Sequence, residues 1–238
     1  MFSYLDQVIR VRRPLDIPFG DYFQEMGSDI GEQLVFFHDD VMFIITFIII
    51  LVFWVMKTTF FNKKFDLNLI HGTKIEIIWT LIPMFILLYI AFPSLKILYK
   101  MDDISNPQIT LKAIGHQWYW KYEINNKTFD SYMVPTNELK DGSFRLLLVD
   151  NQAVLPINSE IRVMSIGGDV IHSFAVPSLA VKSDAIPGRL NQSGFVANRA
   201  GTFFGQCSEI CGSDHSFMPI NIKVETMSNY LNWYNSLD

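Results

Sequence analysis

Cysteine is almost missing from this chain of 238 residues, which contains two thiols in all. Buried structural cysteines usually scatter through a core, so a pair four positions apart argues against simple core filling. Basic residues are in deficit, with 19 Lys and Arg against 24 Asp and Glu. A chain without a basic excess is not expected to bind nucleic acid.

A secretory signal peptide is also expected to be absent. The first forty residues contain no continuous apolar stretch followed by a small-residue cleavage site. The chain is therefore expected to insert into a membrane through its own spans, or to have lost a signal already. No internal repeat or low-complexity stretch is evident.

Apolar residues are abundant, and they concentrate in two runs without charge. They make up 50% of the chain, and the runs cover residues 41–56 and 77–95. A membrane-spanning helix needs about 20 mostly apolar residues, which the second run supplies and the first reaches with its flanks. Buried core helices are the alternative, but neither run has the amphipathic period of a soluble helix. The sequence predicts a transmembrane helical hairpin over residues 34–104, with Pro83 and Pro93 in or at the end of its second helix.

The connection between the two runs indicates their orientation. Residues 57–74 carry four lysines against one aspartate, and lysine-rich loops stay on the cytoplasmic or matrix side. Three arginines in the amino-terminal tail, residues 1–33, lie too far from the first run to reverse this rule. Both termini are therefore expected on the outer side of the membrane.

Short alternating runs separated by turn signals begin near Pro107 and are typical of strands. The seven runs cover residues 108–124, 144–150, 160–166, 171–177, 188–197, 201–207 and 218–225. Short strands at regular spacing predict an antiparallel sandwich or barrel, which we assign to residues 105–226. Residues 227–238 are expected to form a tail or a short helix.

Residue types that bind soft metals gather before the last of these runs. Cys207, Cys211, His215 and Met218 lie within twelve positions, and His172 opens an earlier run. Two His, one Cys and a weak axial Met form blue-copper sites, and a second thiolate can bridge two copper ions. Zinc held by two Cys and two His is one alternative, and a disulfide is another. We favour copper, because zinc would leave Met218 without a role.

Several motifs resemble subunit II of haem-copper cytochrome c oxidases, from the first apolar run to about Val224. They are GHQWYW at 115–120, DVIHSF at 169–174, AVPSL at 175–179, KSDAIPGRLN at 182–191 and GQCSEICG at 205–212. The fold that this resemblance implies is a two-span transmembrane helical hairpin followed by an all-β cupredoxin-like Greek-key barrel.

The resemblance also implies a dinuclear copper centre, CuA, in the barrel. Its implied ligands are the side chains of His172, Cys207, Cys211, His215 and Met218 and the backbone carbonyl of Glu209. The Glu209 side chain is implied to help hold a magnesium ion at the interface with subunit I.

By the same resemblance, electrons pass from cytochrome c to CuA and on to haem in subunit I, where oxygen is reduced to water with proton pumping. Trp118 is implied to receive the electron, although Trp118 and Trp120 would by spacing share one face of a regular strand, where aromatics are ordinarily core. The implied docking residues for cytochrome c are Gln117, Tyr119, Asp150 and Asp169.

Two further features bear on partners. The resemblance places Glu76 at the mouth of a proton path into subunit I, whereas an anchor at the end of a span is the alternative. Residues 124–128 depart from the family, because they lack its acidic tract and contain Lys127. We therefore expect weaker or differently balanced docking of a basic cytochrome c.

Other functional classes explain less of the sequence. A structural subunit of a quinol oxidase would lack copper ligands, and none of them is missing here. A two-span receptor with a disulfide would leave His172, His215 and Met218 unexplained. Richness in Phe, Ile and Asn favours the mitochondrial inner membrane with the barrel in the intermembrane space, and a bacterial plasma membrane with a periplasmic barrel is the alternative.

Overall fold

The structure is a computed structural model that describes residues 23–64 and 70–237. Most of the predicted amino-terminal tail and the centre of the lysine-rich connection therefore lie outside the described residues. The chain divides into two compact units. One is Gln33–Lys100, and the other combines the residues up to Glu32 with Met101–Asp238.

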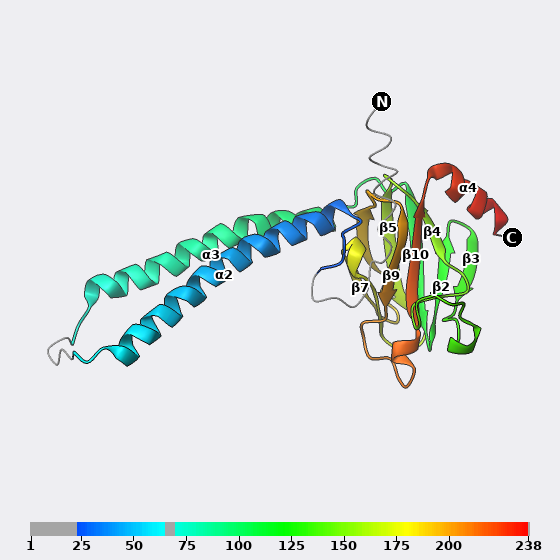
Figure 1. The fold of residues 1–238 in the computed structure, drawn as a ribbon. Coiled ribbons are helices and arrows are strands. Elements are labelled where there is room, and N and C mark those ends of the chain that lie inside the picture. The colour runs from blue at the N-terminus through cyan, green and yellow to red at the C-terminus, as the bar shows by residue number, and fades with distance from the viewer. Residues whose placement is uncertain (1–22, 65–69, 238) are drawn as a thin grey trace, which may run out of the picture. The chain divides into compact units, whose positions relative to one another are not determined.

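Two long helices, α2 (Asp29–Phe61) and α3 (Thr73–Asp102), form the helical hairpin (Figure 1). Both are long and apolar enough to cross a membrane. Pro83 and Pro93 both lie inside α3, where a membrane helix tolerates them. The helices extend into the predicted connection, where Lys57 belongs to α2 and Lys74 to α3. The reason is that polar residues can continue a helix beyond its apolar centre.

The second unit is a β domain of ten strands in its described residues (Figure 1). The strands are β1 (Ile109–His116), β2 (Tyr119–Ile124), β3 (Lys127–Ser131), β4 (Ala153–Pro156), β5 (Glu160–Gly167), β6 (His172–Val176), β7 (Val181–Ala185), β8 (Asn191–Val196), β9 (Gly201–Gln206) and β10 (Pro219–Glu225). They form a five-stranded sheet in the order β3-β2-β1-β5-β8, a three-stranded sheet β4-β10-β9 and the pair β6-β7. Alternate residues of β1, β2 and β5 are buried, as expected for strands with one face on a core.

The prediction of an antiparallel sandwich or barrel is wrong for two pairs of strands. Strand β1 pairs in parallel with β5, and β4 pairs in parallel with β10. Parallel neighbours need a long crossover between them, and more than forty residues separate β1 from β5. The local alternation of apolar residues carries no information on which distant strand becomes the neighbour.

The strand boundaries also differ from the sequence prediction. The run 108–124 is a hairpin of β1 and β2 with a turn at residues 117–118. The run 144–150 forms no regular strand and contributes only an isolated bridge between Met133 and Val149. Strands β3, β4 and β7 were not predicted, because they are short and carry polar or turn-forming residues.

The carboxy-terminal segment forms helix α4 (Met227–Ser236). Thr226 caps its first turn by accepting a hydrogen bond from the backbone N–H of Asn229. Tyr230 is buried against the barrel core, and Trp233 packs edge-on against Phe129 of β3. The apolar residues with helical spacing thus fix this helix on the β domain.

Candidate metal centre

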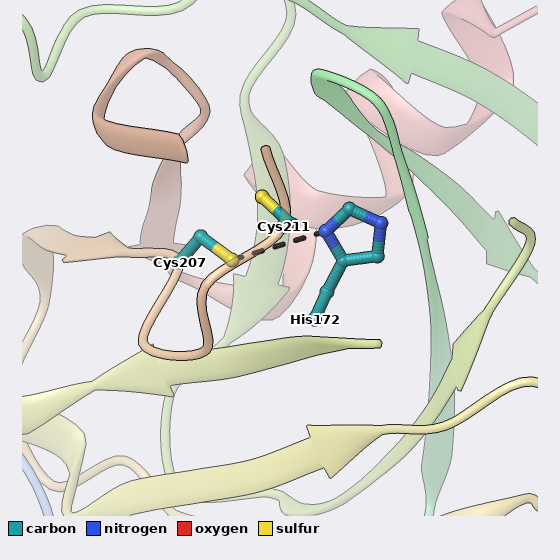
Figure 2. A group of neighbouring side chains, drawn as sticks. All are labelled: His172, Cys207 and Cys211. Carbon is teal, nitrogen blue, oxygen red and sulfur yellow. Dashed lines mark hydrogen bonds between the residues drawn. The ribbon is translucent and has the colours of Figure 1, made fainter. Parts of the chain in front are cut away.

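Three side chains converge at the end of the barrel where β6 begins and β9 ends (Figure 2). The ligand atoms of His172, Cys207 and Cys211 all lie within 4.8 Å of one another, and all three residues are buried. His172 opens β6, whereas the two cysteines lie in the segment between β9 and β10. His172 and Cys207 are 35 residues apart in sequence, and the fold brings His172 Nδ1 to 3.9 Å from Cys207 Sγ.

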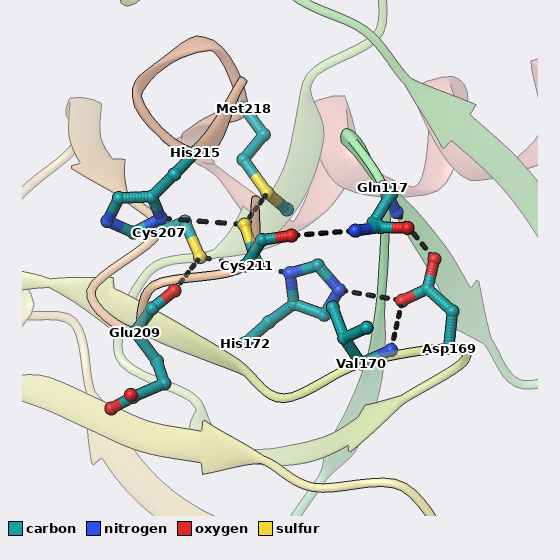
Figure 3. Close-up of polar contacts among 9 residues, drawn as sticks. All are labelled: Gln117, Asp169, Val170, His172, Cys207, Glu209, Cys211, His215 and Met218. Atoms are coloured by element: carbon teal, nitrogen blue, oxygen red, sulfur yellow. Dashed lines mark hydrogen bonds and ion pairs between the residues drawn. The ribbon is translucent and has the colours of Figure 1, made fainter. Parts of the chain in front are cut away.

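The other two predicted side-chain ligands complete the cluster on the Cys211 side (Figure 3). The Nδ1 atom of His215 lies 3.5 Å from Cys211 Sγ. The Sδ atom of Met218 lies 3.6 Å from the same sulfur and is buried. Each thiol therefore has its own imidazole nearby, and the thioether stands beside one of the two.

Glu209 contributes its backbone to the cluster and directs its side chain elsewhere. Its carbonyl oxygen lies 3.4 Å from Cys207 Sγ. Figure 3 shows the carboxylate pointing away from the two sulfurs. Each sulfur thus has one further donor atom beside it: the Glu209 carbonyl oxygen beside Cys207 and the Met218 thioether beside Cys211.

The two thiols are free in the structure and differ in acidity. Burial raises the pKa of Cys207, but hydrogen bonds with His172, with the backbone of Glu209 and Ser173 and with His215 together lower it more, so the pKa lies below its usual value. Burial and the nearby Cys207 raise the pKa of Cys211. A metal ion bound between them would deprotonate both thiols.

The chemistry of these donors fits copper. Two thiolates, two imidazole nitrogens and a thioether form a soft set of the kind that copper prefers. A disulfide would leave the two imidazoles and the buried thioether gathered around the sulfurs without a purpose. The five side chains and the Glu209 carbonyl are the donors that the family resemblance implies for the metal, and they would hold it from the positions described.

Two of the residues that the resemblance assigns to partner docking, Asp169 and Gln117, also contact the cluster. The carboxylate of Asp169 accepts a hydrogen bond from Nε2 of His172 at 2.8 Å, and the Gln117 side chain donates to the carbonyl of Cys211 at 2.8 Å. Burial raises the pKa of Asp169, but hydrogen bonds from His172 and from backbone N–H groups lower it more, so it lies below its usual value. The spacing of Asp169 three residues before His172 was the one sequence signal for this contact.

Trp118 does not lie on a regular strand, because it belongs to the turn between β1 and β2. Trp120 is fully buried in the core, while Trp118 is half-buried and packs against it. The Trp118 ring packs beside Gly212, the residue after Cys211, since a Cβ atom on Gly212 would lie 3.1 Å from the indole Cζ2. The turn thus places an indole next to the cysteine segment.

A groove of about 570 Å³ borders this turn. It is lined by Gln117, Trp118, Tyr119, Tyr132, Met133, Asp214 and Phe217. Tyr119 stacks on Tyr132 with their ring centroids 4.5 Å apart. Asp150 is exposed, and its carboxylate accepts a hydrogen bond from the backbone N–H of Tyr132 at 2.8 Å. Of the predicted docking residues, Gln117 and Tyr119 therefore line the groove, and Asp150 supports its wall.

Glu76 belongs to the helical unit and not to the β domain. It lies in the first turn of α3 and is exposed. Its backbone carbonyl accepts a hydrogen bond from the Thr80 hydroxyl at 2.7 Å. Glu76 does not belong to the cluster formed by His172, Cys207 and Cys211.

Comparison with known proteins gives a consistent result over both units. One family model, "Cytochrome C oxidase subunit II, periplasmic domain", matches residues 109–225, and another, "Cytochrome C oxidase subunit II, transmembrane domain", matches residues 16–97. Cytochrome c oxidase subunit 2 of Metridium senile is 55% identical over 215 residues, which are 88% of this chain and 87% of that protein. The same subunit of Drosophila yakuba is 54% identical over 216 residues, 90% of this chain and 95% of the relative.

A solved structure supports the fold of the β domain. The crystal structure of the periplasmic domain of subunit II of cytochrome oxidase from Bradyrhizobium japonicum superposes with a TM-score of 0.53 and is 46% identical. The match covers 57% of this chain and 96% of that one. The predicted fold class, two long apolar helices followed by a cupredoxin-like β domain, is thereby confirmed.

Proposed function

The chain belongs to the family of cytochrome c oxidase subunit II, a membrane-bound component of a haem-copper oxidase, and on this premise we propose that its β domain carries CuA and transfers electrons from cytochrome c to subunit I. The observation that carries the proposal is the convergence of His172, Cys207 and Cys211 within 4.8 Å. When bound, the copper pair supplies reversible one-electron transfer between cytochrome c and the haem of subunit I. Oxygen reduction and proton pumping belong to the assembled oxidase.

Different atoms of the chain are proposed as the ligands of the metal. Cys207 and Cys211 would hold the metal through their thiolates, and His172 and His215 would bind it through the Nδ1 atoms that face the sulfurs. The Met218 thioether beside Cys211 and the Glu209 carbonyl beside Cys207 would serve as weak ligands. The burial of both cysteines keeps water from the thiolates, so little solvent has to reorganise when the charge of the site changes.

The groove beside Trp118 is proposed as the docking surface for cytochrome c. Its aromatic walls offer a shallow apolar contact, and Asp150 and Asp214 supply negative charge at or behind it. A small surface of this kind suits a transient complex that forms by electrostatic steering. Trp118 is the residue that receives the electron, because its ring contacts the segment that carries Cys211.

Glu209 is proposed to contribute to a second metal, a magnesium ion shared with subunit I. Its carboxylate points away from the sulfurs (Figure 3). A carboxylate is a hard oxygen ligand of the kind that magnesium prefers. One residue would then bind copper through its carbonyl and magnesium through its side chain.

The proposed location is the mitochondrial inner membrane, with both termini and the β domain in the intermembrane space. The animal relatives with 54–55% identity over most of the chain support this location. The lysines that flank the connection between α2 and α3 support the orientation.

Glu76 is proposed to lie at the mouth of a proton path into subunit I. A Glu76→Gln variant, which keeps the shape of the side chain but cannot ionise, is expected to lower the turnover of the assembled oxidase. Turnover equal to that of the wild type, at equal subunit content, would leave Glu76 as a simple anchor of the helix end.

Electron paramagnetic resonance of the full chain in nanodiscs, loaded with copper and oxidised, tests the metal assignment. A hyperfine pattern of seven lines is expected, because one electron is shared equally by two copper nuclei. Cys207→Ser is expected to abolish the pattern, and Ser213→Ala, an exposed position in the same segment, is the control that keeps it. A pattern of four lines would indicate a single copper, and zinc uptake in place of copper would overturn the proposal.

A further inference from the structure

Both oxygens of the Asp169 carboxylate are committed to contacts within the β domain (Figure 3). Oδ1 lies 2.8 Å from His172 Nε2 and also accepts from the backbone N–H of Val170 at 2.6 Å. Oδ2 accepts from the backbone N–H of Gln117 at 2.7 Å. Asp169 therefore joins the turn between β1 and β2 to the buried ring of His172.

Gln117 makes the corresponding connection to the cysteine segment. Its side-chain Nε2 donates a hydrogen bond to the carbonyl of Cys211 at 2.8 Å. The turn at residues 117–118 is thus tied through Asp169 to one metal-binding segment and through the Gln117 side chain to the other. These contacts join residues 52 and 94 positions apart in sequence.

We propose that Asp169 and Gln117 are positioning residues of the metal centre, forming a hydrogen-bonded bridge between the segments that carry His172 and Cys211. The inference rests on the proposed copper function and names how the chain orients two of its ligands. The same bridge runs through the turn that carries Trp118, so the residue that receives the electron is fixed to both ligand segments.

The geometry around His172 explains why such a bridge matters. The ring is fully buried, and Gly115 lies so close beneath it that a Cβ atom there would stand 2.7 Å from the ring. With Nδ1 facing Cys207 and Nε2 facing Asp169, the carboxylate holds the proton on Nε2 and leaves the Nδ1 lone pair for the metal. A carboxylate partner on the far nitrogen also makes an imidazole ligand more basic, and its loss typically lowers metal affinity about 10–100-fold.

A docking role for the same two residues predicts different consequences. A carboxylate that only attracts cytochrome c would alter the Michaelis constant and its salt dependence without changing the metal centre. The Asp169 side chain is 34% exposed, so some of its charge does reach the surface. The two roles are separated by measuring the metal centre directly, without cytochrome c.

The test uses the full chain in nanodiscs loaded with copper, with Asp150→Asn as the matched control. Asp150 is also an exposed carboxylate bonded to backbone N–H groups, but its partners are Tyr132 and Asn151 rather than a ligand. Asp169→Ala is expected to release copper to a chelator about 10–100-fold faster and to change the hyperfine pattern. Gln117→Ala is expected to have a smaller effect, because the backbone N–H bond to Asp169 survives.

Asp169→Asn keeps the shape of the side chain and decides the question if the alanine variant fails to fold. Removing the negative charge beside His172 destabilises the more positive oxidised state, so the reduction potential is expected to rise. A wild-type release rate and hyperfine pattern in Asp169→Ala, or a wild-type potential in Asp169→Asn, would overturn the inference. A wild-type chain without the seven-line pattern would overturn the proposed function itself, so the two failures are distinguishable.

Discussion

At the scale of single residues, the metal centre depends on the lack of a side chain at Gly115. Gly115 of β1 lies against the His172 ring, and an added Cβ would approach Cδ2 and Cγ to 2.7 Å. Carbon atoms in real structures do not approach so closely, so a methyl group at this position would force the fully buried ring to shift. The absence of a methyl group at Gly115 therefore leaves the room that the imidazole occupies beside β1.

Gly115→Ala is expected to displace His172 and to weaken copper binding at least tenfold. The physical reason is steric, because the ring must move away from β1 and so from its place beside Cys207. Chelator competition on the full chain measures the effect. Gly72→Ala is the control, since nothing lies within 4 Å of a Cβ at that position, and equal copper affinity in the two variants would contradict the argument.

At the scale of elements, the first turn of α2 is part of the β domain. Ser28 is fully buried, donates its hydroxyl to the carbonyl of Leu179 at 2.8 Å and accepts from the backbone N–H of Gly31 at 3.1 Å. Gly27 donates to the carbonyl of Ser178 and accepts from the N–H of Asn198. The hydroxyl of Ser28 thus caps a helix and satisfies a barrel carbonyl at the same time.

Ser28→Ala is expected to lower the free energy of unfolding of the β domain by about 1–2 kcal/mol, because a helix cap and a buried hydrogen bond are lost together. Urea unfolding followed by tryptophan fluorescence measures the change in detergent. Ser105→Ala, at an exposed position, is the control. Equal unfolding midpoints would show that residues 27–28 do not stabilise the barrel.

In residues 124–128, the tract that departs from the family, the positive charge of Lys127 is directed at the end of α4. Lys127 donates its ammonium to the carbonyls of Tyr234 and Leu237 and lies 5.1 Å from the Tyr234 ring centroid. It therefore stabilises the end of α4, where backbone carbonyls concentrate negative charge. The flanking acids are also paired, Glu123 with Lys112 at 2.9 Å and Asp130 with Lys121 at 3.8 Å.

Because these charges are paired within the chain, the tract offers little net charge to a basic cytochrome c. We expect the Michaelis constant for cytochrome c to rise only slightly as ionic strength increases, since salt screens only the charges that act between the partners. Steady-state oxidation of cytochrome c by the assembled oxidase across ionic strengths is the measurement. A steep salt dependence would mean that the remaining acids of the groove are sufficient for steering.

At the scale of the whole molecule, two long apolar helices are joined by a connection flanked with lysine. The large apolar side chains of α2 and α3 are mostly exposed in the single chain, which suits contact with lipid or with other apolar helices. Lys57 lies near the end of α2 and Lys74 at the start of α3. From the positive-inside rule we predict both termini on the outer side.

Cysteine labelling tests this orientation, because the two native thiols are buried. An Asn62→Cys variant places a thiol just after α2, and Asn126→Cys places one in the exposed turn after β2. In sealed vesicles with the outer face exposed, a membrane-impermeant maleimide is expected to label position 126 at once and position 62 only after permeabilisation. The reverse pattern would overturn the predicted orientation.

Those features of this protein that depend on local composition can be predicted from the amino-acid sequence. Hydropathy predicted both spans, because transfer into lipid depends on the side chains of the segment itself. The spacing of Cys207, Cys211, His215 and Met218 suggested a copper site, because ligands in one short segment stay together in any fold. The resemblance of the motifs to a known family then added the role of the Glu209 carbonyl, which spacing could not supply.

Which distant segments meet, by contrast, depends on the folded chain as a whole. The parallel pairing of β1 with β5, the turn that holds Trp118, and the approach of Gly115 to His172 all depend on packing between strands far apart in sequence. Asp169 and Gln117 were predicted from family resemblance to dock a partner, yet their hydrogen bonds reach the ligand segments. A local pattern specifies which face of a strand is buried, but the neighbours of that face are set by the free energy of the whole core.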